Sequence, residues 1–116
     1  MIELKNLSIY VATNPIDFRA SIDGLCMRIT QDYEGDPQQG VYVFYNRARD
    51  KLKLLCWHRT GFMLLYKRLE RGRFHVVLDP SKKTISMDEK QLRWLIAGMD
   101  WSLLNECPDL SFGTYG

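Results

Sequence analysis

Apolar runs of strand length predict a β-sheet in the first half of the chain. Residues 7–12 combine β-forming side chains with partial alternation, and residues 40–45 (GVYVFY) are rich in β-branched and aromatic side chains. Residues 51–57 (KLKLLCW) begin with alternating lysine and leucine, so successive side chains face opposite sides of a strand. The polar segment 46–50 (NRARD) separates the last two runs, which predicts a hairpin with a basic tip.

Apolar residues at helical spacing predict a first helix over about residues 16–32, directly after Pro15. Gly24 inside it costs roughly 1 kcal/mol relative to alanine, which indicates close backbone packing or a bend. Residues 62–69 (FMLLYKRL) carry apolar side chains at i, i+3, i+4 and i+7, which fits a second helix that ends at Gly72. A strand is the alternative for these same residues.

The remaining pattern completes an α+β fold. Residues 73–78 read as a strand and residues 84–86 as a short extended piece. Ser86 is placed to cap a last helix with Glu89 at the capping-box position, and Gly98 or Asp100 should end that helix. We therefore expect an antiparallel sheet of about four strands with about three helices packed on it. Residues 1–104 should form a single domain, and residues 105–116, which lack periodicity, a loosely ordered C-terminal tail.

Composition supports one ordinary globular domain. The chain has 116 residues, of which 46% are hydrophobic and 26% charged. No apolar run approaches the roughly 18 residues of a membrane span, and the N-terminus lacks a signal-peptide layout, so a cytoplasmic protein is expected. The odd set Cys26, Cys56 and Cys107 contains no CxxC pair, which argues against a disulfide framework or a zinc site.

Charge distribution is more informative than net charge, which is only +2. Residues 47–73 hold nine basic and two acidic residues, a local charge of +7, whereas the other seven basic and twelve acidic residues leave −5. Such a stretch can track a nucleic-acid backbone, and Tyr45, Trp57 and Tyr66 could stack on bases if exposed. The alternative is a solvated face with these aromatics in the core. The candidate binding residues are Arg47, Arg49, Lys51, Lys53, Lys67, Arg68, Arg71 and Arg73.

Residues with catalytic potential do not form a recognisable site. Asp17 and Asp23, six apart on the expected helix, would point to different sides and could not share a metal ion. His58 and His75 have no second ligand at i+3 or i+4. No phosphate loop, dinucleotide fingerprint or nucleophile elbow occurs. We expect neither a metal nor a cofactor, and no enzymatic activity.

A series of short motifs gives the chain a family resemblance over residues 7–101. They are DFR at 17–19, DGL at 23–25, VF at 43–44, NR at 46–47, DK at 50–51, KLLCW at 53–57, TGF at 60–62, KRLERGRF at 67–74, QL at 91–92 and LIAGMDW at 95–101. In their order and spacing the chain resembles the accessory proteins (TnpB, or second-reading-frame proteins) encoded beside the transposase in IS66-type bacterial insertion sequences. It departs from that pattern at His58 and at residues 75–77.

The resemblance implies a protein that assists transposition beside a separate transposase, and it supplies no catalytic residues to carry over. Three hypotheses follow. The first is a non-catalytic accessory factor that contacts DNA, transposase or both through the basic stretch. The second is an adaptor that binds transposase without touching DNA. The third is a metal-dependent nuclease, for which only the scattered carboxylates and the transposon setting speak.

Overall fold

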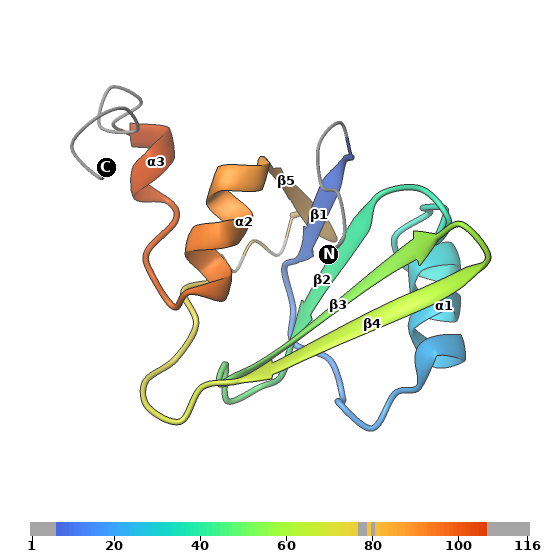
Figure 1. Ribbon diagram of the computed structural model, residues 1–116, viewed down its shortest axis with the longest axis horizontal. Coiled ribbons are helices and arrows are strands. Elements are labelled where there is room, and N and C mark those ends of the chain that lie inside the picture. The colour runs from blue at the N-terminus through green and yellow to red at the C-terminus, as the bar shows by residue number, and fades with distance from the viewer. Residues whose placement is uncertain (1–6, 77–78, 80, 107–116) are drawn as a thin grey trace.

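The computed structural model describes residues 7–76, 79 and 81–106, and its centre is a five-stranded mixed sheet (Figure 1). The strands are β1 (Ile9–Ala12), β2 (Val41–Tyr45), β3 (Lys51–His58), β4 (Gly61–Arg68) and β5 (Thr84–Met87), in the spatial order β4-β3-β2-β1-β5. The helices are α1 (Ile22–Gln31), α2 (Glu89–Ile96) and the single turn α3 (Leu103–Glu106).

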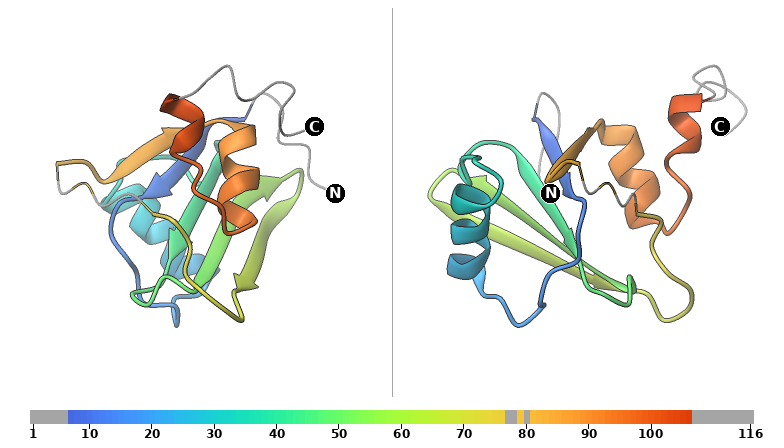
Figure 2. Two further views of the ribbon diagram at one scale, coloured as in Figure 1. Left: turned by 90° about the vertical axis from the view of Figure 1, so that its left-hand side faces the viewer. Right: turned by 180° about the vertical axis from the view of Figure 1, so that it is seen from behind.

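Helices α1 and α2 cover opposite faces of the sheet (Figure 2). Leu25 and Ile29 of α1 and Leu92 and Leu95 of α2 are fully buried, so each helix contributes its apolar stripe to the core. The expected α+β class is confirmed. Its details differ, because the described sheet has five strands and carries two packed helices, whereas α3 is one turn long.

One pair of strands is parallel, which corrects the expectation of an antiparallel sheet. β1 pairs with β2 in the same direction, from Ile9 opposite Val41 to Val11 opposite Val43. The chain between these strands includes α1, and a crossover of that length returns it to the same end of the sheet. The other neighbouring strands pair antiparallel, and the predicted hairpin of β2 and β3 is confirmed.

The first helix begins later than predicted. Ser21 is its N-cap and accepts from the Gly24 amide, so α1 starts at Ile22. Residues 16–20 instead form a loop, in which the Asp17 side chain accepts from the Arg19 amide at 2.9 Å. A Cβ at Gly24 would meet only the side chains of Ala20 and Ser21, at 3.6 and 3.8 Å, so close backbone packing does not explain this glycine.

The prediction of a helix over 62–69 is wrong, and the alternative, a strand, is correct. All eight residues of β4 pair with β3, from His58 opposite Gly61 to Lys51 opposite Arg68. A two-residue turn joins the strands, with Arg59 in the left-handed conformation at φ 56°. Nearly every residue from 62 to 66 is apolar, so apolar side chains fall at helical spacing by chance. Pairing with β3 is what makes this segment a strand.

Three smaller expectations also change. Residues 73–76 are not in a strand, and 77–78 lie outside the described residues. Ser86 belongs to β5. Asp88 is the N-cap of α2, with Gln91 completing the capping box. The expected stop at Gly98 is confirmed, because α2 ends at Ile96 with Ala97 as its C-cap, and Gly98 follows in the left-handed conformation at φ 82°. The expected tail from 105 begins within α3, and residues 107–116 lie outside the described part.

Candidate nucleic-acid interface

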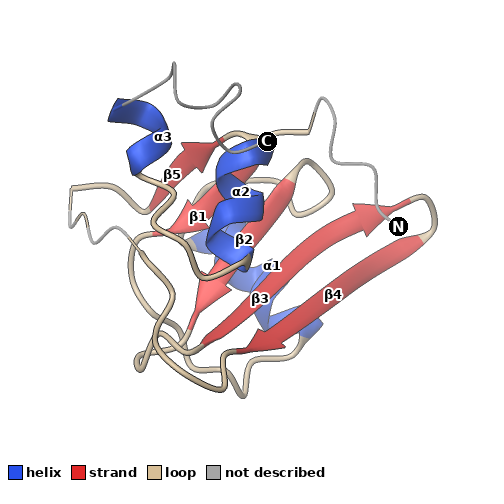
Figure 3. Cartoon of the chain, turned by 60° about the vertical axis from the view of Figure 1, so that its left-hand side comes forward, coloured by secondary structure: helices blue, strands red, loops and turns tan. Residues whose placement is uncertain are grey.

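The β2–β3 turn and the segment that follows β4 lie side by side at one end of the sheet (Figure 3). The Leu69 amide donates to the Asp50 carbonyl at 2.7 Å, and the Phe74 amide donates to the Arg49 carbonyl at 2.6 Å. These contacts join main chain to main chain, so they hold the two segments together whatever their side chains do.

The loop 13–20 reaches the same end of the sheet. The Ile16 amide donates to the carbonyl of Tyr45, the last residue of β2, at 3.0 Å. Residues 15–18 and 46–48 line an open hollow of about 470 Å³ between this loop and the hairpin turn. Three segments that are distant in sequence thus meet at one place.

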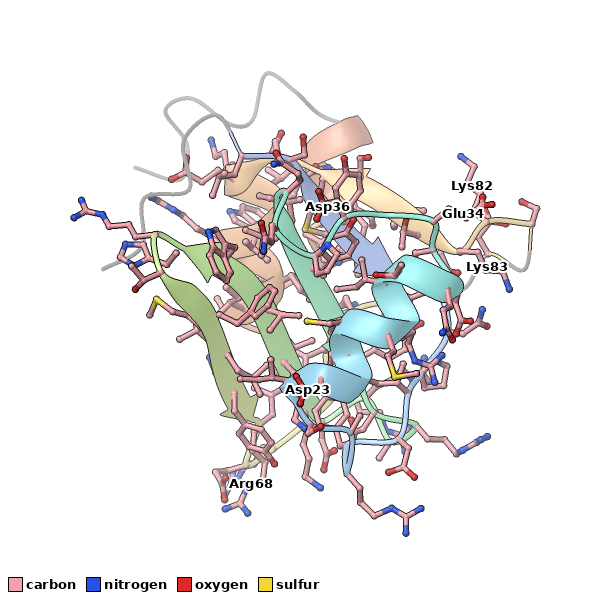
Figure 4. All side chains as sticks on the ribbon, turned by 90° about the vertical axis from the view of Figure 1, so that its right-hand side faces the viewer. Asp23, Glu34, Asp36, Arg68, Lys82 and Lys83 are labelled. Carbon is pink, nitrogen blue, oxygen red and sulfur yellow. The ribbon has the colours of Figure 1, made fainter. Side chains whose placement is uncertain are left out.

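Positive charge gathers where these segments meet. Together with the adjoining ends of β3 and β4, they carry eight basic residues against the three acidic residues Asp17, Asp50 and Glu70, which leaves a net +5. Figure 4 shows Arg68 at the end of β4, on the far side of the molecule from Glu34 and Asp36. We call this surface the basic end; its members are Arg19, Arg47, Arg49, Lys51, Lys67, Arg68, Arg71 and Arg73.

Asn46 gives the hairpin turn its shape. Its side-chain oxygen accepts from the amides of Asp50 and Lys51 at 3.1 and 3.0 Å, and its Nδ2 donates to the Asp50 carboxylate at 2.6 Å. This hydrogen bond lowers the pKa of Asp50. Arg49 has φ 62°, and Arg47 is exposed at the tip. The hydrogen bonds of Asn46 therefore fix the backbone of the turn that carries Arg47 and Arg49.

Two arginines of the basic end are already paired with carboxylates. Arg19 contacts Asp17 at 2.6 Å and, mainly through side-chain hydrogen bonds, lowers the pKa of that carboxyl to about 2. Arg68 contacts Glu70 at 2.9 Å. Both pairs are solvent-exposed, and a phosphate can compete with a carboxylate in such a pair at little cost.

Three other arginines, Arg47, Arg71 and Arg73, are exposed and form no ion pair with any described residue. Arg47 comes from the hairpin turn and the other two from the segment after β4. They are the cations at this end that an incoming anion meets without displacing a carboxylate.

Lys53, a predicted binding residue, lies apart from the other seven. Its side chain is 8% exposed, and Nζ donates to the carbonyls of Phe18 and Ala20 at 2.7 and 3.2 Å. The ammonium also lies 4.9 Å from the centre of the Phe18 ring. Lys53 therefore fastens the loop before α1 to the sheet and is not available at the surface.

Lys67 and Arg19 also differ from the sequence picture. Lys67 is exposed, but its Nζ donates to the Ile96 carbonyl at 2.7 Å and so satisfies the C-terminal end of α2. Arg19, which the sequence placed on a helix, instead lies in the loop at the basic end. The turn-forming Asp17 and the capping Ser21 were the signals that could have placed it there.

The interleaved aromatic residues divide between core and surface. Tyr45 is fully buried, and Trp57 is half-buried with its ring centre 5.0 Å from that of Phe62. Tyr66 is 54% exposed and touches Phe18 edge-on at 6.2 Å. Of the three, Tyr66 alone offers an exposed ring to a base.

Groups that could support catalysis are not gathered in the described part of the chain. Asp17 is paired in its loop, Asp23 lies in the first turn of α1, and no cluster of three metal-binding side chains occurs among the described residues. Burial raises the thiol pKa of Cys26 and Cys56. Both are therefore protonated and poor nucleophiles at neutral pH. No helix in this part of the chain is long and apolar enough to cross a membrane.

The described part of the chain is thus a small α+β domain with a basic end. The chain belongs to the IS66 Orf2-like protein family, whose model matches residues 7–106, and this confirms the resemblance inferred from the motifs. The family suggests an accessory role in transposition, which agrees with a protein that is not itself an enzyme.

Two proteins of Sinorhizobium fredii (strain NBRC 101917 / NGR234) are similar along most of their length. The uncharacterized protein y4jC is 33% identical over 106 residues, which span 90% of this chain and 89% of the relative. The uncharacterized protein y4hO is 32% identical over 100 residues, 84% of each chain. No solved structure matches the chain.

Proposed function

We propose that this protein is a non-catalytic accessory factor of transposition that binds DNA of its insertion sequence through the basic end. The observation that supports this most is that main-chain hydrogen bonds bring three arginine-bearing segments together at one end of the sheet. Arginine forms bidentate hydrogen bonds with phosphate, and a cluster of arginines releases counterions from the duplex on binding.

The binding residues proposed here come from the basic end. Arg47, Arg71 and Arg73 contact phosphates first, and Arg19 and Arg68 exchange their carboxylate partners for phosphate oxygens. Lys51 and Arg49 line the same turn. Lys53 is left out, because its ammonium is buried and engaged with two carbonyls.

Transposase of the same element is the second proposed partner. A basic surface also suits an acidic protein, and the exposed ion pairs Arg19–Asp17 and Arg68–Glu70 demonstrate that carboxylates fit among these arginines. If the protein binds transposase and not DNA, it is an adaptor. The experiment below distinguishes this adaptor function from DNA binding.

The test is a gel-shift titration of element-end DNA with the full chain, with and without transposase, together with co-purification of transposase. The double variant Arg47→Glu/Arg73→Glu should lose the shift. Arg59→Glu is the matched control in dilute, monomeric protein, since Arg59 is an exposed arginine in the β3–β4 turn, at the other end of the sheet. Its shift should equal that of the wild type.

Absence of a shift at every salt concentration, with co-purification retained, would replace DNA binding by the adaptor function. Equal losses in the double variant and in Arg59→Glu would show that general charge matters and the basic end does not. Metal-dependent cleavage of DNA by the pure wild-type protein, lost in Asp17→Ala, would instead favour a nuclease.

A further inference from the structure

Strand β4 is an edge of the sheet with an exposed, uncharged main part. It is hydrogen-bonded to β3 alone among the described strands, and Figure 3 shows it as the outermost strand. Its first six residues, 61–66 (GFMLLY), contain neither a charge nor a proline. Met63, Leu65 and Tyr66 are 37%, 46% and 54% exposed.

An edge of this kind is unusual for a protein that stays alone. Natural edge strands are commonly short, charged, bulged or interrupted by proline, because their free N–H and C=O groups recruit other strands. β5, at the other edge, is only four residues long, whereas β4 has eight. Residues 61–66 contain no charge and no proline, and their one-to-one pairing with β3 has no bulge.

The sequence of β4 is complementary to itself in the antiparallel sense. When two copies pair about Leu64, Met63 lies opposite Leu65 of the second copy, and Phe62 lies opposite its Tyr66. Residues that are opposite in an antiparallel pair share a face, so both faces gain apolar cross-strand contacts. Such pairs stabilise the association in addition to the main-chain hydrogen bonds.

Charge selects this arrangement over the parallel one. The basic residues Lys67 and Arg68 stand together at one end of β4. Parallel pairing would set the two basic pairs beside each other, and like charges in that position repel. Antiparallel pairing about Leu64 places Lys67 opposite Gly61 of the second copy and keeps the basic pairs at opposite ends of the joint.

We propose that β4 is the edge through which a second copy of this chain binds, by antiparallel pairing about Leu64. The two five-stranded sheets join into one continuous sheet around a two-fold axis. A two-fold axis closes the assembly as a dimer and places the two basic ends at opposite ends of the joint. The proposal does not depend on the proposed function.

Sedimentation equilibrium of the full chain, from micromolar to millimolar concentration, tests this pairing. The wild type should move from 13.6 kDa to twice that mass as concentration rises. Leu65→Glu and Met63→Lys should each weaken the dimer at least about tenfold, because each sets a charge against an apolar partner. Met27→Glu is the control, since Met27 is 58% exposed on α1, and it should dimerise like the wild type.

The double variant Met63→Lys/Leu65→Glu tests the register itself. Each introduced lysine then faces a glutamate of the second copy, so the dimer should return to within a few fold of wild-type strength. Hydrogen exchange should also show β4 amides becoming slower with protein concentration while β5 amides do not change.

A wild type that stays at 13.6 kDa through the millimolar range would overturn the proposal. So would a Leu65→Glu dimer as strong as that of Met27→Glu. A double variant no stronger than the single variants would exclude the antiparallel register about Leu64. Growth into larger open-ended particles would contradict the closed two-fold pairing.

Discussion

Strands β3 and β4 are neighbours of equal length and similar apolar content, but their environments are opposite. In β3, residues from Leu52 to Cys56 are all buried, including one lysine. In β4, no residue is buried, and its last four are exposed. The difference comes from position: β3 has a strand on each side and a helix over each face, whereas β4 has a strand on one side alone. Thus position in the sheet, more than composition, decides which changes affect stability and which affect binding.

The largest expected difference is between Leu55 and Leu65. Leu55 of β3 is 0% exposed, so Leu55→Ala should reduce the free energy of unfolding by about 2–5 kcal/mol through lost burial and a cavity. Leu65 of β4 is 46% exposed, and Leu65→Ala should change it by less than about 0.5 kcal/mol in dilute, monomeric protein. Urea unfolding at low concentration measures both, and equal effects would refute the contrast.

The next largest expected difference in unfolding free energy is between two lysines of β3, Lys53, which holds a loop, and Lys51, which does not. Lys53→Ala leaves the carbonyls of Phe18 and Ala20 without their donor and should cost about 1–3 kcal/mol of unfolding free energy. Lys51→Ala, two residues earlier on the same face and half-buried, should cost much less. DNA affinity should respond in the reverse order, as titrations with folded protein would show. A Lys53→Ala protein of wild-type stability would contradict the anchoring role.

A smaller effect concerns Tyr45, which pairs with Leu52 of β3. Its hydroxyl is buried with no hydrogen-bond partner among the described residues, so Tyr45→Phe should leave stability unchanged or raise it by up to about 1 kcal/mol at neutral pH.

The same hydroxyl predicts a loss of stability at alkaline pH. Burial raises the pKa of Tyr45 to about 12, above its ordinary 10.0, because the folded state disfavours the phenolate. Its contribution is therefore complete below pH 10 and falls as pH rises from there towards 12. Thermal unfolding at about pH 8 and about pH 11 should show a smaller decline for Tyr45→Phe than for the wild type. An equal decline in both would mean that Tyr45 is not the group responsible.

The smallest expected effect on stability is that of Arg68, at the end of β4. Its ion pair with Glu70 is largely exposed, so Arg68→Ala should change the free energy of unfolding by less than about 0.5 kcal/mol. The same change should weaken DNA binding. A stability loss as large as that of Lys53→Ala would mean that the end of β4 is part of the core.

The sequence was sufficient for features that depend on local pattern. Alternation in 51–57 and the polar turn before it predicted the β2–β3 hairpin, and the charge count indicated the basic stretch. β4 was mistaken for a helix because an almost uniformly apolar run has no period of its own. The alternation correctly predicted that Lys51 and Lys53 share one face of β3. The loop that covers Lys53, however, starts more than thirty residues earlier in the chain.

The candidate site was only partly predictable for a related reason. The sequence named seven of the basic residues that gather at one end, and it omitted Arg19. What brings them together is a set of backbone hydrogen bonds between distant segments, such as that from Phe74 to Arg49. Long-range contacts of this kind leave no local signal, since each segment alone reads as a polar loop.

Salt dependence of DNA affinity tests the role of the basic end most directly. We predict that log affinity falls linearly with log salt, and that Arg47→Gln, Arg71→Gln and Arg73→Gln each reduce the slope by about 0.9, the value of one phosphate contact. In dilute, monomeric protein Arg59→Gln, at the other end of the sheet, should leave the slope unchanged. If all four variants change the slope equally, or none does, the basic end is not the surface that binds DNA.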